Sequence, residues 1–173
     1  LHRALRADKL TLAALEGGGE AVAFASGSAA TLAVFSLAAA GGRVVCSSDC
    51  YHGTAKQLRE TLPRWGGTAE FVDTTDLDAV RRALEPGAAL LWVETPSNPL
   101  LRVSDLAALA GLARSCGALL GCDNTFASPV LQQPFAHGAD LVMHSSTKYL
   151  GGHSDVLGGI LVSVLLPVYD LIG

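Results

Sequence analysis

Short apolar runs alternate with longer stretches of helical spacing along the chain. The apolar runs predict strands, because each is rich in Val, Leu, Ala or Ile and is bounded by polar residues or glycine. We expect strands at residues 21–25, 43–46, 70–72, 90–93, 119–122, 141–144 and 158–164. The intervening stretches predict helices at residues 5–15, 29–40, 54–62, 76–84 and 104–116.

The ends of these helices carry recognisable signals. Ser104 is expected to cap the helix 104–116, and Thr75 or Asp76 the helix 76–84, because their side-chain oxygens can accept from free backbone amides. Glycines follow the first two helices, and Pro63 is expected to close the helix 54–62.

Strands and helices follow one another at the spacing of βαβ units, and several strands are apolar throughout. Both features indicate a mainly parallel sheet covered by helices on both faces, a three-layer α/β fold. We find no linker or repeat, so residues 1–173 are predicted to form one domain. In such sheets ligands bind beyond the carboxyl ends of the strands.

Composition narrows the function classes. The net charge is −4 and no cluster of Lys and Arg occurs, which argues against nucleic-acid binding. No apolar run is long enough to cross a bilayer, and the first residues do not resemble a signal peptide, so we expect a cytoplasmic protein that binds no membrane. Its four cysteines form no CxxC pair; reduced thiols are expected, and a zinc site built from them would be poorly spaced.

The most informative stretch is Ser145–Asp155, which places Lys148 among hydroxyls and glycines after the apolar run 141–143. Burial at a strand end disfavours a charged ammonium, so we expect the Lys148 amine to be a usable nucleophile. The hydroxyls of Ser145 and Thr147 can donate to an anion such as a phosphate. A lysine nucleophile beside a phosphate site is what pyridoxal 5'-phosphate (PLP) requires. Taken alone, Ser-Thr-Lys is more often a polar surface turn.

Two further motifs fit the same chemistry. The turn 25–30 joins a strand to a helix, and the amides of Gly27 and Ser28 would open that helix toward an anion. Asp123 follows an apolar strand and could hold a pyridine nitrogen protonated. The plainer interpretations are a structural glycine turn and a solvated carboxylate or helix cap.

Two loops complete the set of candidates. Tyr51 follows the strand 43–46 and could stack on a flat cofactor and assist proton movement, although a loop tyrosine is usually a surface residue. Asn98 lies in Glu94-Thr95-Pro96-Ser97-Asn98-Pro99, where two prolines stiffen the loop and the amide can meet a polar ligand.

Together these motifs resemble the PLP-binding domain of the Cys/Met-metabolism (trans-sulfuration) enzymes, which include cystathionine γ-synthase, cystathionine γ- and β-lyases and methionine γ-lyase. The matching segments are in family order and cover nearly the whole chain. They are residues 15–18, 24–30, 51–54, 94–99 and 123–129 and the lysine segment 145–155.

The resemblance implies a fold and a set of residue roles. The fold would be the large domain of the aspartate-aminotransferase type. Lys148 would bind PLP covalently, Asp123 would pair with its ring nitrogen, and Tyr51 would stack on its ring. The phosphate would be bound by four residues, namely Gly27 and Ser28 through their amides and Ser145 and Thr147 through their hydroxyls. Asn98 would lie near the cofactor's phenolic oxygen or the substrate carboxylate.

The chain is shorter than members of this family. A Tyr-x-Arg segment that precedes the matched region in the family is absent, as is the smaller C-terminal domain, so we expect an incomplete large domain. Losing a bidentate arginine from a buried phosphate or carboxylate costs roughly 2–5 kcal/mol of binding. The chain alone is therefore expected to bind PLP weakly and to turn over poorly or not at all.

The resemblance implies β or γ elimination or replacement on sulfur amino acids or activated homoserine. The run 97–103 looks closest to the γ-synthase branch, with γ- or β-lyase as alternatives. A catalytically inactive remnant is a further alternative, opposed by the intact Lys148, Asp123 and Tyr51. A nucleotide-binding domain would need a GxGxxG or P-loop motif, and neither occurs. By resemblance, the full-length protein would be a homodimer or homotetramer.

Overall fold

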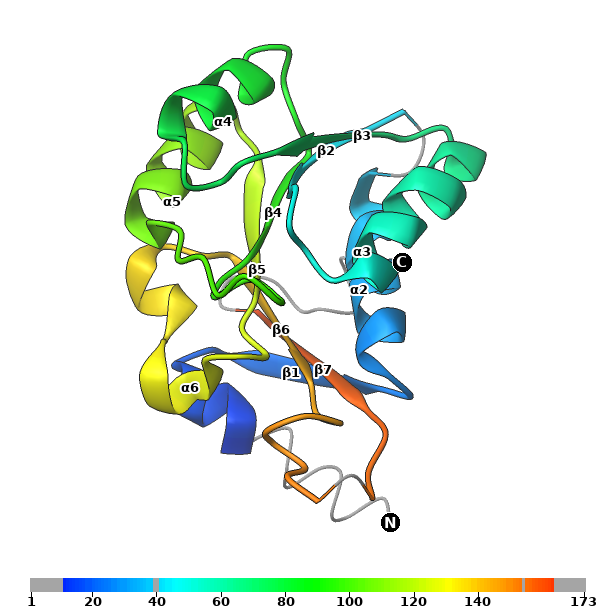
Figure 1. The fold of residues 1–173 in the computed structure, drawn as a ribbon, viewed down its shortest axis with the longest axis vertical. Coiled ribbons are helices and arrows are strands. Elements are labelled where there is room, and N and C mark those ends of the chain that lie inside the picture. Colours follow the sequence, from blue (N-terminus) through cyan, green and yellow to red (C-terminus); the bar gives the residue numbers. More distant parts are fainter. Residues whose placement is uncertain (1–10, 39–40, 154, 164–173) are drawn as a thin grey trace.

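The computed structural model describes residues 11–38, 41–153 and 155–163, which form a seven-stranded sheet with helices on both faces (Figure 1). The strand order is β1-β7-β6-β5-β4-β2-β3. The strands are β1 (Glu20–Phe24), β2 (Arg43–Ser47), β3 (Thr68–Val72), β4 (Leu90–Glu94), β5 (Leu119–Asp123), β6 (Leu141–Ser145) and β7 (Gly159–Ser163).

The sheet is mixed but mostly parallel, as predicted. From β3 through β6 every neighbouring pair is parallel, whereas β7 pairs antiparallel with both β6 and β1. Because β2, β4, β5 and β6 run in the same direction, their carboxyl ends meet at one edge of the molecule. The antiparallel edge, β7 with β1, was not foreseen from the sequence.

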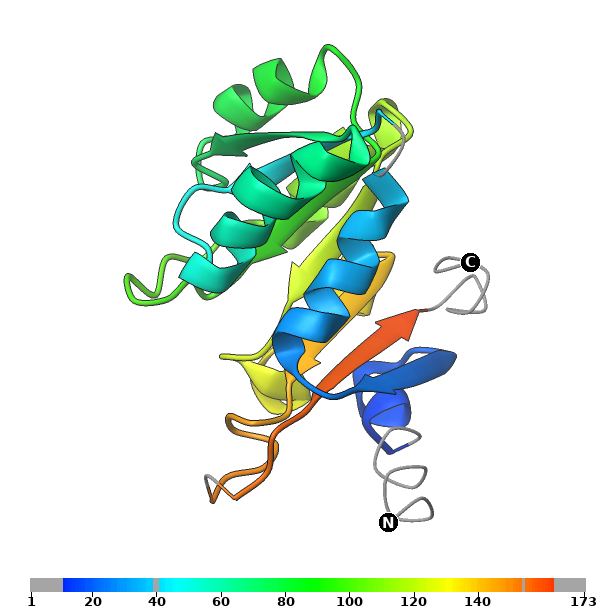
Figure 2. The ribbon, with the colours of Figure 1, turned by 90° about the vertical axis from the view of Figure 1, so that its right-hand side faces the viewer.

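The helices lie in two layers, seen on opposite sides of the sheet in Figures 1 and 2. One layer contains α2 (Gly27–Phe35) and a continuous helical stretch from α3 (His52–Lys56) to residue 65. The other contains α4 (Leu77–Leu84) and α5 (Leu106–Ser115). Shorter elements are α6 (Ser128–Leu131) and the 3-10 turns Ser36–Ala38 and Pro134–His137.

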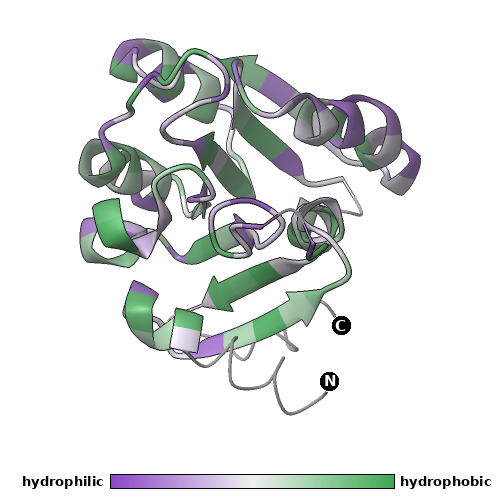
Figure 3. Ribbon diagram, turned by 60° about the horizontal axis from the view of Figure 1, so that its bottom comes forward, coloured by the Kyte–Doolittle hydropathy of each residue, from purple (hydrophilic) through white to green (hydrophobic). Residues whose placement is uncertain are grey.

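The centre of the sheet explains why the apolar runs become strands. Residues Leu90–Val93 of β4 have no solvent exposure, and their side chains alternate between the two layers. Trp92 packs in the α2 layer, where its ring meets Phe35 edge-on at a centroid distance of 5.5 Å. Leu91 and Val93 pack in the layer of α4 and α5. A strand buried on both faces has no polar side to alternate with, which is why its sequence is continuously apolar. Figure 3 shows the strands mostly in the colour of hydrophobic residues.

The expected cap of the helix 104–116 is wrong. α5 begins at Leu106, and Asp105 is its N-cap, because its Oδ1 accepts from the Ala108 amide at 3.0 Å. Ser104 is buried instead, and its hydroxyl pairs with Thr74 Oγ1 at 2.8 Å. Both residues are good caps by type, so local sequence did not distinguish them.

The expected end of the helix 54–62 is also wrong. The helical stretch starts earlier, at His52, and runs through Pro63 to Trp65. Pro63 lies in the first turn of a 3-10 segment, where its missing N–H is not needed, and Gly66, with φ of 83°, ends the stretch.

The other boundaries agree with the prediction to within about two residues where they can be compared, and Asp76 caps α4 as expected. The helix predicted at 29–40 starts earlier, at Gly27, and its α-helical part ends at Phe35. Residues 11–16 are helical, consistent with the helix predicted at 5–15. Positions 5–10, 39–40 and 164 of the predicted elements lie outside the described residues.

Candidate functional site

A pocket of about 180 Å³ lies at the carboxyl ends of the parallel strands. Strands β4, β5 and β6 end there at Glu94, Asp123 and Ser145, and α2 begins there. All eight residues singled out from the sequence line this one pocket, although they span more than a hundred positions of the chain. They are Gly27, Ser28, Tyr51, Asn98, Asp123, Ser145, Thr147 and Lys148.

The first turn of α2 presents free amides to the pocket. Ser26 caps the helix, its Oγ accepting from the Ala29 amide at 3.1 Å and its carbonyl from the Ala30 amide at 3.1 Å. The amides of Gly27 and Ser28 have no acceptor within the helix, as the geometry of a helix start requires. Together with the positive end of the helix dipole, these amides make an anion site.

Gly27 is required by the close approach of two elements. A Cβ added at this position would lie 2.8 Å from the Ser145 Cβ, closer than real side chains pack. The glycine therefore lets the start of α2 approach the end of β6. Ser145 lines the pocket next to this approach.

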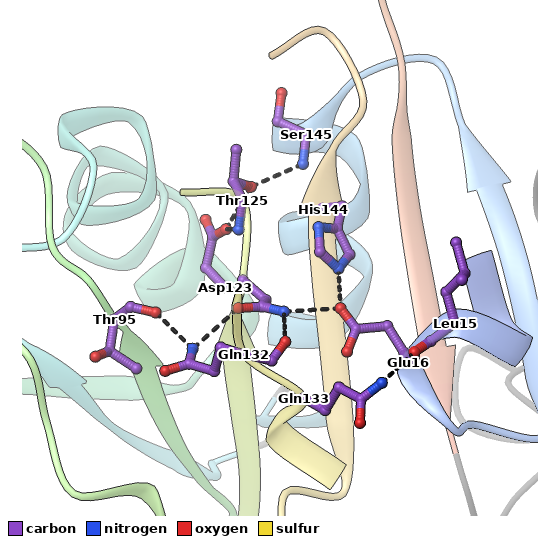
Figure 4. A network of polar contacts seen from close by, with 10 residues as sticks. Leu15, Glu16, Thr95, Asp123, Thr125, Gln132, Gln133, His144 and Ser145 are labelled. Atoms are coloured by element: carbon purple, nitrogen blue, oxygen red, sulfur yellow. Dashed lines mark hydrogen bonds and ion pairs between the residues drawn. The ribbon is translucent and has the colours of Figure 1, made fainter. Parts of the chain in front are cut away.

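The carboxylate at the end of β5 is held by its neighbour Thr125 (Figure 4). Asp123 Oδ1 accepts from the Thr125 amide at 3.0 Å and from its hydroxyl at 2.5 Å. The same hydroxyl accepts from the Ser145 amide at 2.9 Å, which ties the ends of β5 and β6 together. Burial raises the pKa of Asp123, while the bonds from Thr125 act in the opposite direction. Thr125 was not singled out from the sequence as a site residue.

Lys148 is exposed, which corrects the expectation that the end of a buried strand would bury it. β6 ends at Ser145, and Lys148 lies three residues later in a turn, where its amide donates to the Ser145 carbonyl at 3.1 Å. The turn carries the side chain out of the sheet to the pocket wall. Lys56, the other described lysine, is paired with Glu60 and does not line the pocket; Lys9 lies outside the described residues.

Thr147 is partly engaged within the protein. Its hydroxyl bridges the amide of Gly158 at 3.2 Å and the carbonyl of the same residue at 3.4 Å. The lysine turn is thereby joined to the start of β7. The hydroxyl still lines the pocket, next to Lys148.

Tyr51 also lines the pocket. Its ring is 43% exposed, lies edge-on to His52 at 5.0 Å, and covers Gly53 so closely that a Cβ there would be 2.4 Å from a ring carbon. A half-exposed ring at the mouth of a pocket offers a flat surface on which a planar ligand can stack.

Glu94 lines the pocket but was not singled out from the sequence. It is 4% exposed, its Oε2 accepts from the Tyr51 amide at 2.5 Å, and it pairs with Asp123 across the β4–β5 ladder. Burial, and then the charge of Asp123, raise the pKa of Glu94 to about 8. The sequence did contain a signal for Glu94 as a site residue, because Glu94 ends an apolar strand just as Asp123 does.

The raised pKa of Glu94 predicts a pH-dependent stability. Between pH 4.5 and 8 the folded state retains a proton that the unfolded chain has lost, so the free energy of unfolding falls as the pH rises, by at most about 1.4 kcal/mol per pH unit. Glu94→Gln is expected to flatten this slope in denaturant titrations made at several pH values. An unchanged slope in the variant would show that another group titrates.

A second polar network is built around three buried side chains, those of Glu16, Asn124 and His144 (Figure 4). His144 Nε2 lies 2.5 Å from Glu16 Oε1, and the Asn124 side-chain amide donates to the same oxygen at 2.7 Å. Gln132 joins this network through Asn124 at 2.9 Å. Since His144 and Asn124 directly neighbour Ser145 and Asp123 in the chain, the network fixes the strand ends that carry the site residues. Sequence spacing did not reveal the pairing, because Glu16 and His144 are 128 positions apart.

Breaking this buried pair is expected to be costly. His144→Ala leaves Glu16 buried with one partner fewer and should lower the free energy of unfolding by about 3–5 kcal/mol in chemical denaturation. The double variant His144→Leu with Glu16→Met removes both polar groups and should recover much of that loss. Equal stabilities of His144→Ala and the wild type would contradict this account of the network.

Within the described residues, no group of three or more His, Cys, Asp or Glu side chains has the arrangement of a metal site. All four cysteines are free; Cys46 and Cys50 bring their sulfur atoms to 3.6 Å, and burial raises the pKa of Cys46. The helices in the described ranges are all too short or too polar to cross a membrane.

Comparison with known proteins gives consistent matches. The sequence profile of the Cys/Met metabolism PLP-dependent enzyme family matches residues 6–167. The chain is 47% identical to cystathionine gamma-lyase of Bacillus subtilis over 149 residues and 49% identical to cystathionine gamma-synthase of Mycobacterium tuberculosis over 154 residues. These alignments cover 86% and 88% of the chain, but only 39% and 40% of the relatives.

A solved structure shows the same fold. The crystal structure of cystathionine gamma-lyase from Lactobacillus plantarum complexed with L-serine superposes with a TM-score of 0.92 at 45% identity, over 96% of this chain and 44% of that one. The fold is thus the large-domain fold of these enzymes, as the sequence resemblance implied. With the profile covering nearly all of the chain, the protein belongs to the Cys/Met metabolism PLP-dependent enzyme family.

Proposed function

We propose that this chain forms the PLP-binding part of a trans-sulfuration enzyme that acts on a sulfur amino acid or an activated homoserine. The observation that carries the proposal is the single pocket that gathers a lysine, a buried carboxylate, a half-exposed tyrosine and the free amides of a helix start. Each of these groups matches one part of PLP: aldehyde, ring nitrogen, ring face and phosphate.

The donor set fits the cofactor. The amides of Gly27 and Ser28 and the hydroxyls of Ser145 and Thr147 would hold the phosphate, in the space that the absent side chain of Gly27 leaves open. Asn98, on the same pocket, would donate to the phenolic oxygen or to the substrate carboxylate. Tyr51 would cover the ring.

PLP, when bound, supplies an electron sink for carbanion chemistry at the α carbon of an amino acid. Asp123 would hold a proton on the ring nitrogen, because its carboxylate is buried and fixed by Thr125. The Lys148 Nζ would first bind the cofactor and then, once released, take the α proton from the substrate. The Tyr51 hydroxyl would assist later proton transfers toward the β or γ carbon.

The proposed reaction class is elimination or replacement at the β or γ carbon. The relatives at 49%, 47% and 46% identity are a cystathionine γ-synthase, a cystathionine γ-lyase and a cystathionine β-lyase. These similar identities support the chemistry that the three enzymes share, but they do not select one substrate. We retain γ-synthase as the specific proposal, on the sequence pattern of residues 97–103.

The proposal extends to assembly: the full-length protein would be a homodimer or homotetramer. Several large apolar side chains are exposed, including Val130 (86%) and Leu131 (81%) in α6 and Leu157 (73%) on the pocket wall. Exposed apolar surface of this kind is typical of protein–protein contacts.

The experiment that tests the function is substrate α-proton exchange in D₂O. The chain loaded with PLP is incubated with cystathionine, or with an O-acyl homoserine and cysteine, and followed by proton NMR. We expect loss of the α-proton signal; new cystathionine would identify a synthase, and released cysteine or homocysteine a γ- or β-lyase. Saturation with PLP and no exchange on any of these substrates would contradict the proposal.

A further inference from the structure

We propose that Glu94 is a positioning residue of the pocket, which fixes the Tyr51 loop and the Asn98 loop to the end of β4. The inference rests on the proposed function, because Tyr51 and Asn98 are the residues proposed to contact the cofactor from these two loops.

The contacts of Glu94 reach both loops. Its Oε2 accepts from the backbone amide of Tyr51 at 2.5 Å, across 43 positions of the chain. The backbone amide of Asn98, four residues further on, interacts with the same carboxyl and lowers its pKa. The Glu94 amide itself donates to Ser47 Oγ at 3.3 Å, at the end of β2. One residue therefore joins the end of β4 to the two loops that flank it.

The start of α3, which carries Tyr51, is not fixed by a side-chain cap of its own. α3 has no side-chain cap: Tyr51 occupies the N-cap position and makes no side-chain hydrogen bond to the helix start. The Tyr51 ring is half-exposed and contacts its near neighbours His52 and Gly53. The bond from its amide to Glu94 is a short, partly buried contact that links this residue to the end of β4.

The charges around Glu94 favour a positioning role over direct chemistry. Asp123 on β5 and Asp49 in the loop after β2 both raise its pKa, and Lys148 lines the same pocket from the β6 side. With a pKa of about 8, Glu94 retains its proton at neutral pH. A neutral Glu94 leaves Asp123 as the acidic group available to a cationic ring nitrogen.

The first test is hydrogen–deuterium exchange of backbone amides in the whole chain. Glu94→Ala is expected to speed exchange at Tyr51 and Asn98 by about tenfold or more, because the Tyr51 amide loses its acceptor and the Asn98 amide loses its interaction with the carboxyl. Glu94→Gln keeps an acceptor oxygen and should stay within about threefold of the wild type. The Ser48 amide, bonded to the Val72 carbonyl at 2.8 Å, is the internal control and should not change.

Shortening the side chain gives a second variant if Glu94→Ala does not fold. Glu94→Asp keeps the carboxyl but withdraws it by one methylene, so exchange at Tyr51 and Asn98 should rise while Glu94→Gln remains protected. Protection of both amides in Glu94→Asp or Glu94→Ala at the wild-type level would overturn the proposal.

The second test is the dissociation constant of PLP, measured by absorbance titration. It should rise by about tenfold in Glu94→Ala and by less than threefold in Glu94→Gln. Wild-type affinity in a Glu94→Ala chain with fast-exchanging loops would overturn the positioning role. Failure of the wild type itself to bind PLP would instead refute the proposed function, and the exchange experiment separates the two results.

Discussion

Replacement of Lys148 by alanine is expected to abolish both covalent PLP attachment and substrate α-proton exchange. The amine is proposed to bind the cofactor and then to take the α proton, so its removal should slow exchange by at least about 10³-fold. The visible absorbance that appears when PLP is added to the wild type should also be lost. Because Lys148 is exposed, the free energy of unfolding should change by less than about 0.5 kcal/mol.

Lys56→Ala is the matched control for this variant. Lys56 is also an exposed lysine, but it pairs with Glu60 and lies outside the pocket. It should retain wild-type absorbance and exchange. A Lys148→Ala chain that keeps the absorbance band would show that another lysine binds the cofactor.

Replacement of Asp123 by alanine is expected to reduce α-proton exchange by about 10²–10³-fold, while PLP attachment to Lys148 persists. Without this buried carboxylate the ring nitrogen loses its proton more readily, and the charge that develops in the reaction is less well stabilised. Asp123→Asn should lose most of the same activity, since its amide keeps the size but not the charge. Exchange rates by NMR, together with the PLP dissociation constant, measure both effects.

Asp140→Ala is the control for the Asp123 variants. Asp140 is a carboxylate outside the pocket that accepts from the Leu120 amide at 2.7 Å, beside the start of β5. Its loss should leave exchange per bound PLP unchanged. Near-normal exchange in Asp123→Ala would exclude the proposed role of this residue.

Much of the fold could be predicted because its central strands are buried on both faces. The continuous apolar run Leu90–Val93 and the βαβ spacing led to a mainly parallel sheet, which the structure confirms. The antiparallel edge could not be predicted, because β1 and β7 are separated by most of the chain and neither has a distinctive pattern. The cap of α5 was wrongly predicted to be Ser104, because Ser104 and its neighbour Asp105, the observed cap, are both good caps by type.

The residues that line the site could be predicted better than their exposure and their hydrogen-bond partners. Residues at strand ends converge in a parallel sheet, so Asp123, Ser145 and Lys148 were expected near one another, and all line one pocket. The exposure of Lys148 was not foreseen, because it depends on the turn after β6 rather than on the strand. The roles of Glu94 and Glu16 depend on partners 43 and 128 positions away, which spacing along the chain does not reveal.

The most direct test of the central claim is to reduce the PLP-loaded chain with borohydride, digest it and map the labelled peptide by mass spectrometry. The account predicts one phosphopyridoxyl label, on Lys148. A label on Lys9 or Lys56 in place of Lys148, or no label at saturating PLP, would contradict it.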